Sequence, residues 1–152
     1  RAKEHLFATS KEITQEFPGV TAYISVNKGL VTQASAAIPI LPLYMAILYK
    51  VMKEKGIHEG CIEQMYRLFH DKLLADKPQV DEDGMIRMDD WEMREDVQQE
   101  VKQAWDRINS DNLQQLADVD GYWEDFYHMF GFGIDGVDYD ADVEVDKAVP
   151  SI

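Results

Sequence analysis

The chain has 152 residues, 45% apolar and 29% charged, which is enough for one domain with a buried core and excludes disordered and collagen-like classes. The net charge of −14 is uneven: residues 1–76 carry nine basic and eight acidic side chains, whereas residues 77–152 carry six basic and 21 acidic ones. The acidic half would repel nucleic acid and anionic membranes, so we expect neither as a partner.

The first elements are a helix and a strand. Residues 1–17 carry apolar side chains at helical spacing, and Pro18-Gly19 ends the predicted helix. The segment Val20–Val26 alternates and is rich in β-forming residues, so we predict a buried strand. A helix followed by a strand, with no strand before it, is half of a βαβ unit. The pattern therefore predicts an α/β fold whose sheet continues in polypeptide outside this sequence.

An apolar helix follows the polar turn formed by residues 27–35. We expect this helix over Pro39–Lys55, with Pro39 and Pro42 in its first turn, where a missing N–H costs little. The apolar run Ala36–Tyr49 has 14 residues and two prolines, so it is too short and too broken to cross a membrane. It is interpreted as a buried helix.

The next two elements are a helix and a hairpin. A helix is predicted over His58–Ala75, and its apolar stripe is interpreted as core packing rather than a cofactor site. Asp83-Gly84 is a tight-turn signal before the alternating residues 85–88, which predicts a short hairpin or an extended lobe. The stripe consists of Ile62, Met65, Tyr66, Phe69 and Leu73.

The C-terminal part is predicted to be helical before it becomes an acidic tail. A helix is expected over Trp91–Ile108, with Asp89 or Asp90 as its N-cap. Two short helices are expected over Asn112–Leu116 and Gly121–Phe130. Residues 131–152 are rich in aspartate and glycine and are expected to form a solvated wrap.

No metal site is expected. The aspartates from Asp138 onward have a spacing like that of calcium loops, but the glycine and glutamate that an EF-hand requires are not in place. The four histidines lack ligand-like spacing and cysteine partners. The single cysteine, Cys61, fits a reducing compartment and is interpreted as a small helix residue rather than a nucleophile.

Several motifs, in order, resemble one enzyme family. The segments RAKEHL, SVNKGLVTQAS, HEGCIEQMYRLF, IRMDDWEMREDVQ and GYWEDFYHMFGFGIDGVDYDADV are similar to the trans-2-enoyl-CoA reductases, NADH-dependent enzymes that look like enlarged short-chain dehydrogenases. The resemblance implies the C-terminal part of a Rossmann-like fold, mostly helical here, with one core parallel strand and a small hairpin. Residues 1–35 would end the NAD-binding domain, residues 36–130 would form a helical substrate-binding region, and residues 131–152 would be an acidic tail.

The resemblance also implies a catalytic lysine. Lys3 matches the lysine of the family's Tyr-x8-Lys motif, whose tyrosine would precede Arg1. Such an ammonium would bind the nicotinamide ribose and lower the pKa of the tyrosine, which stabilises the enolate and supplies a proton. Without the resemblance, a lysine near a helix start is ordinarily a solvated surface residue.

The turn after the strand is the second implied site. By resemblance, Leu30, Val31 and Thr32 contact the dinucleotide through backbone N–H groups and the Thr32 hydroxyl. The alternative is that Thr32 or Ser35 caps the following helix.

The helix that follows this turn is the third implied site. By resemblance to the family's substrate-binding helix, Tyr44, Met45 and Leu48 would line the acyl chain. The alternative is that these three side chains fill the core.

The function implied is NADH-dependent reduction of the C2–C3 double bond of an enoyl-CoA or other enoyl thioester in fatty acid synthesis. The N-terminal portion of the same enzyme, in the same or a separate chain, would be the main protein partner. The compartment would be a bacterial cytoplasm or a mitochondrial matrix. The alternative is a non-catalytic interaction subunit whose acidic half faces a basic partner.

Overall fold

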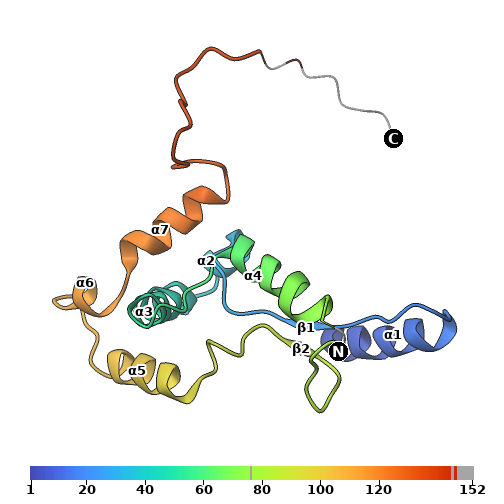
Figure 1. The fold of residues 1–152 in the computed structure, drawn as a ribbon. Coiled ribbons are helices and arrows are strands. Elements are labelled where there is room, and N and C mark those ends of the chain that lie inside the picture. Colours follow the sequence, from blue (N-terminus) through green and yellow to red (C-terminus); the bar gives the residue numbers. More distant parts are fainter. Residues whose placement is uncertain (76, 145, 147–152) are drawn as a thin grey trace.

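The structure is a computed structural model that describes residues 1–75, 77–144 and 146 (Figure 1). Helices dominate these residues, and two short strands join them. The elements in chain order are α1 (Ala2–Glu16), β1 (Ser25–Val26), α2 (Gln33–Ala36), α3 (Leu41–Glu54), α4 (Cys61–Arg67), the π-helix η1 (Leu68–Leu73), β2 (Ile86–Arg87), α5 (Glu95–Trp105), α6 (Leu113–Leu116) and α7 (Val119–His128).

The two strands form a parallel pair. Ser25 lies opposite Ile86, and the amide N–H of Met88 donates to the carbonyl oxygen of Val26 at 2.8 Å. This pairing confirms the parallel sheet expected of an α/β fold. Because the carboxyl ends of parallel strands meet at one edge, the turn after β1 lies beside the segment after β2. That edge carries the candidate site.

The expected hairpin or extended lobe is present as a tight turn. Gly84 has a φ of +82° and donates its N–H to the Asp81 carbonyl oxygen at 3.0 Å, and the N–H of Asp81 donates to the Met85 carbonyl oxygen at 2.8 Å. The strand partner of Ile86–Arg87 is, however, β1, about sixty residues earlier in the chain. A turn signal reports only local geometry, so it could not show this partner.

The strand predicted over Val20–Val26 shortens to Ser25–Val26, and Val20 is half exposed rather than buried. A strand is defined by its hydrogen-bonding partner, and β2, its partner among the described residues, is itself two residues long. The carbonyl oxygen of Ile24 still accepts the N–H of Ile86 at 2.9 Å, so the strand prediction extends too far only over residues 20–23 of the described structure.

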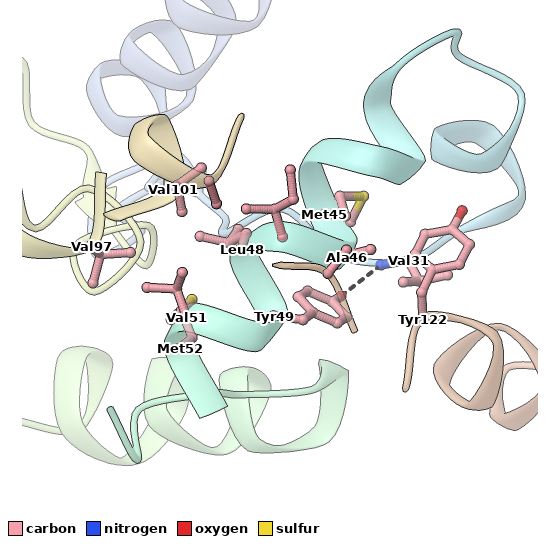
Figure 2. Close-up of a cluster of buried hydrophobic side chains, with 13 residues drawn as sticks. Val31, Met45, Ala46, Leu48, Tyr49, Val51, Met52, Val97, Val101 and Tyr122 are labelled. Carbon is pink, nitrogen blue, oxygen red and sulfur yellow. Dashed lines mark hydrogen bonds between the residues drawn. The ribbon is translucent and has the colours of Figure 1, made fainter. Parts of the chain in front are cut away.

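The helix α3 is the centre of the main core. Its buried face packs against α2, α5 and α7. Figure 2 shows Val97 and Val101 of α5 on one side of α3. On the other side lie Val31, from the turn after β1, and Tyr122 of α7. The helix begins at Leu41, so Pro42 lies in its first turn as predicted, whereas Pro39 precedes it. It ends before Gly56, whose φ is +66°.

The core interpretation of the next stripe is wrong for three of its five residues. Ile62, Tyr66 and Phe69 are 77%, 63% and 57% exposed. Met65 and Leu73 do pack against a second, smaller cluster formed by Leu68, Ile86 and Met88. The helix also changes to π-helical geometry at Leu68, which rotates the stripe.

The inward face of α4 is polar instead. Arg67 is buried and donates from Nε and Nη2 to the two carboxylate oxygens of Glu59, at 2.6 and 2.8 Å. It also donates to the carboxylate of Asp90 and to the carbonyl oxygen of Met88, both at 2.8 Å. A hydrophobic pattern cannot reveal a face that is held by ion pairs.

The C-terminal helices differ from the predicted ranges chiefly at the start of α5. The helix α5 starts at Glu95 rather than Trp91, because Asp89 and Asp90 do not cap it. Asp89 pairs with Arg87, and Asp90 pairs with Arg67 and Lys72. The helices α6 and α7 lie close to the expected ranges. The described part of the tail, residues 131–144 and 146, extends away from the helices (Figure 1).

Across the described ranges, none of the helices combines the length and the apolar character that crossing a membrane requires.

Candidate functional site

The turn after β1 is held by three side chains. The N–H of Gly29 donates to Oε2 of Glu92 at 2.7 Å, and the N–H of Val31 donates to the hydroxyl of Tyr49 at 3.1 Å. The N–H of Thr32 donates to the Ser35 hydroxyl at 2.8 Å. The N–H groups of Val31 and Thr32, which were expected to bind the dinucleotide, have internal acceptors in this structure.

Thr32 caps α2, which is the alternative weighed for this residue. Its hydroxyl oxygen accepts the N–H of Ser35 at 3.0 Å, and the Ser35 hydroxyl accepts the N–H of Thr32 in return. The two residues form a reciprocal capping box. Thr32 is nevertheless exposed, so a ligand can reach its side chain.

A cavity of about 860 Å³ opens beside this turn. Leu30, Val31 and Tyr49 line it from the turn and α3, and the segments 58–63 and 124–134 complete it. Apolar and titratable side chains both contribute, a mixture typical of small-molecule sites. The remaining lining residues are Lys53, His58, Gly60, Cys61, Ile62, Glu63, Glu124, Asp125, His128, Met129 and Ile134.

A buried lysine lies behind the cavity. Lys28 is 2% exposed, and its ammonium sits 4.6 Å from the centroid of the Tyr49 ring and donates to the Gly29 carbonyl oxygen at 3.2 Å. Burial lowers the pKa of Lys28 to about 8, although the negative charge of Glu92 opposes this. Burial also raises the pKa of Tyr49, so its hydroxyl stays protonated.

His58 lines the cavity as a neutral ring. Burial lowers its pKa to about 4, and the positive charges of Lys28 and Lys53 add to this effect. The ring contacts Tyr49 edge-on, with centroids 4.4 Å apart, and Nε2 lies 4.0 Å from the carboxylate of Asp125. Burial raises the pKa of Asp125.

The ring of His58 is expected to remain unprotonated down to about pH 4. Between pH 6.5 and that value the unfolded chain binds the extra proton, so acidification removes at most about 3 kcal/mol of stability through this residue. The raised pKa of Asp125 has the opposite sign and reduces the loss. Histidine NMR titration, with His58→Gln to assign the signal, measures this; a His58 signal that titrates at its ordinary pKa would contradict the burial argument.

Lys3 is not brought to the turn by the contacts of this chain. It lies exposed in the first turn of α1, a helix with no buried residue, and it makes no hydrogen bond or ion pair with another described residue. Its role as a catalytic residue stays a prediction.

The acyl-chain role assigned to α3 is corrected for two of its three residues. Met45 and Leu48 are 1% and 0% exposed and fill the core, so no acyl chain can reach them in this arrangement. Tyr44 is partly buried and donates its hydroxyl to Oε1 of Glu92 at 2.8 Å. Burial raises the pKa of Tyr44 to about 12.

Sequence reasoning missed Lys28, Tyr49, His58 and Glu92. A lysine two residues after the predicted strand was the available signal for Lys28. Glu92 gave none, because the parallel pairing that brings it to Gly29 joins segments 63 residues apart. Within the described residues no three histidine, cysteine, aspartate or glutamate side chains gather as a metal site would require.

Two family models match consecutive parts of the chain. Residues 1–74 match the "Trans-2-enoyl-CoA reductase catalytic region", and residues 80–143 match the "Enoyl reductase FAD binding domain". The cofactor turn lies in the first segment, and Glu92 lies in the second.

The second segment does not fit FAD. It carries 19 acidic side chains against four basic ones, a balance that would repel the diphosphate of a flavin dinucleotide. Its glycines Gly131, Gly133 and Gly136 are not followed by a helix within the described residues, so they do not form a dinucleotide fingerprint. FAD is therefore given no part in the chemistry of this chain.

Relatives match the whole chain. It is 56% identical to an "Enoyl-[acyl-carrier-protein] reductase [NADH]" of Coxiella burnetii, covering 100% of this chain and 38% of the relative. It is 55% identical to a "Trans-2-enoyl-CoA reductase" of Euglena gracilis, covering 99% of this chain and 28% of that protein.

Solved structures agree. The crystal structure of Clostridium acetobutylicum trans-2-enoyl-CoA reductase in complex with NAD is 49% identical, with a TM-score of 0.86 over 94% of this chain and 38% of that one. The Treponema denticola enzyme in complex with NAD is 50% identical, with a TM-score of 0.86 over 93% and 36%. This chain spans less than two fifths of the length of these relatives. It belongs to the trans-2-enoyl-CoA reductase family and corresponds to the C-terminal part of its members.

Proposed function

We propose that this chain is the C-terminal part of an NADH-dependent trans-2-enoyl thioester reductase. The observation that carries the proposal is that both segments match enoyl reductase family models and that the whole chain is 56% and 55% identical to two reductases of this kind. The position of the turn supports it, because ligands of α/β folds bind at the carboxyl ends of parallel strands. The complete reductase means this chain together with the preceding part of the fold.

In the proposed reaction, bound NADH supplies a hydride to the β-carbon of the enoyl thioester. Lys3 binds the ribose of the cofactor and lowers the pKa of a tyrosine in the preceding part of the fold. That tyrosine stabilises the developing enolate and supplies the proton. Leu30 and the exposed side chain of Thr32 contact the dinucleotide, while the N–H groups of Val31 and Thr32 hold the turn in shape.

The cavity beside the turn is proposed to receive the acyl chain. Its lining takes the role that was expected of Met45 and Leu48. Leu30, Val31, Met129 and Ile134 supply apolar lining. An aliphatic chain gains free energy from such a surface in proportion to the apolar area it buries. Tyr44 faces Glu92 rather than this cavity, so it is assigned to the support of the turn.

The preceding part of the fold is proposed to be the main protein partner. Phe17 directly after α1, Ile62 and Tyr66 on α4, and Phe69 on η1 are each more than half exposed. Large apolar side chains that gather on a surface mark interaction sites. The compartment is proposed to be a bacterial cytoplasm, or else a mitochondrial matrix; the Coxiella burnetii relative is bacterial.

The test is NADH oxidation by the complete reductase with crotonyl-CoA. We expect one butyryl-CoA to form for each NADH consumed, with no NADH loss when butyryl-CoA replaces crotonyl-CoA. Intact, folded protein that neither binds NADH nor consumes it would contradict the proposal and would favour the non-catalytic interaction subunit.

A further inference from the structure

We infer that Glu92 is a positioning residue that sets the geometry of the cofactor turn from the other matched segment of the chain. The inference rests on the proposed function of that turn. It adds a residue that contacts neither cofactor nor substrate and acts through the backbone of Gly29.

Both carboxylate oxygens and the backbone carbonyl oxygen of Glu92 accept hydrogen bonds. Its side chain is buried, 8% exposed, on the loop between β2 and α5. One carboxylate oxygen accepts the N–H of Gly29 at 2.7 Å, and the other accepts the hydroxyl of Tyr44 at 2.8 Å. The backbone carbonyl of Glu92 accepts Nε2 of Gln98 at 2.8 Å, which ties the loop to α5.

The turn is thereby fixed at two alternate amides. Glu92 holds Gly29 from one direction, and Tyr49 of α3 holds Val31 from the other. Leu30 lies between these two fixed points and lines the cavity. The backbone of Leu30 is therefore held on both sides.

A carboxylate is suited to this task. A hydrogen bond from an amide to a charged acceptor is about twice as strong as one between neutral groups, and its strength grows where water is excluded. The buried ammonium of Lys28, next to Gly29 in the chain, offsets the charge of Glu92 electrostatically. Displacing a reacting group by about 1 Å can lower a rate by roughly 10²-fold, so a firmly held turn has catalytic value.

Variants of Glu92 separate positioning from general stability. Glu92→Ala removes both acceptors. Glu92→Gln keeps a carbonyl oxygen that can accept the N–H of Gly29 and an NH2 group that can donate to the hydroxyl oxygen of Tyr44. Glu95→Gln is the matched control, because Glu95 lies three residues away, is exposed and loses the same charge. If Glu92→Ala does not fold, Glu92→Asp takes its place, since a shorter carboxylate cannot reach both donors.

The experiment measures amide hydrogen exchange and NADH kinetics of the complete reductase. For Glu92→Ala we expect exchange in residues 28–32 to rise by about tenfold or more while α3 keeps its protection, and KM for NADH to rise by about tenfold. Glu92→Gln should bring both the exchange rates and KM to within about threefold of the wild-type values. Glu95→Gln should have the wild-type values of both.

Unchanged exchange in residues 28–32 would overturn the inference. So would an unchanged KM for NADH together with a general loss of protection, since that result would mean a structural role only. If the wild-type protein consumes no NADH, the proposed function fails; a selective rise of exchange in residues 28–32 would still support Glu92 as the residue that positions the turn.

Discussion

Replacing Lys3 with alanine in the complete reductase is expected to lower kcat/KM for enoyl-CoA reduction by about 10²–10⁴-fold. The variant removes the ammonium that is proposed to bind the ribose and to lower the pKa of the proton-donating tyrosine. The loss should be smaller at high pH, because the wild-type tyrosine, whose pKa is lowered, there loses the proton that it must supply, whereas the tyrosine of the variant keeps it. The measurement is the rate of NADH oxidation with crotonyl-CoA across a range of pH.

Lys11→Ala is the control for this prediction. Lys11 is an exposed lysine on the same helix, so the variant removes the same charge and leaves α1 intact. It should retain the activity of the wild type. A Lys3→Ala enzyme with undiminished kcat/KM would return Lys3 to the ordinary alternative, a solvated surface residue.

Replacing Arg67 with alanine is expected to destabilise the protein by about 3–5 kcal/mol. The guanidinium is buried against Glu59, Asp90 and the Met88 carbonyl, and it stacks 4.1 Å from the centroid of the Trp91 ring. Its loss leaves the carboxylate of Glu59 buried without its two hydrogen bonds. Denaturant unfolding, followed by tryptophan fluorescence, measures the change. Variants of the other tryptophans identify the part of the signal that comes from Trp91.

Two further variants show whether the cost comes from the stranded carboxylate. Arg94→Ala removes an exposed guanidinium that pairs with Asp96, and it should cost less than about 1 kcal/mol. The double variant Arg67→Met with Glu59→Leu removes both buried charges and should recover most of the stability. An Arg67→Ala protein as stable as Arg94→Ala would contradict the role given to the buried pair.

Local patterns predicted the helices better than the sheet. The helix α3 follows from a continuous apolar run that begins near a proline and ends before a glycine, all of which are local features. The pairing of β1 with β2 joins segments about sixty residues apart, and the turn signal at Gly84 did not indicate it. Contacts at such separation depend on the whole fold, so one sequence does not reveal them.

The candidate site was predicted in outline but not in detail. The motif around Leu30–Thr32 located the turn, which lies at the carboxyl end of β1 and borders the cavity. The motif did not reveal that the hydroxyls of Tyr49 and Ser35 accept the N–H groups of Val31 and Thr32. Met45 and Leu48, expected to line the acyl chain, lie in the core instead, because a pattern of apolar residues does not distinguish a core face from a pocket wall.

The measurement that most directly tests the proposed site is a structure of the complete reductase with bound NADH. We expect the ammonium of Lys3 within hydrogen-bonding distance, about 3 Å, of a hydroxyl of the nicotinamide ribose. The nicotinamide should lie against Leu30 and Thr32, with Glu92 still bonded to the N–H of Gly29. A cofactor bound away from the turn, with Lys3 pointing into solvent, would contradict the proposal.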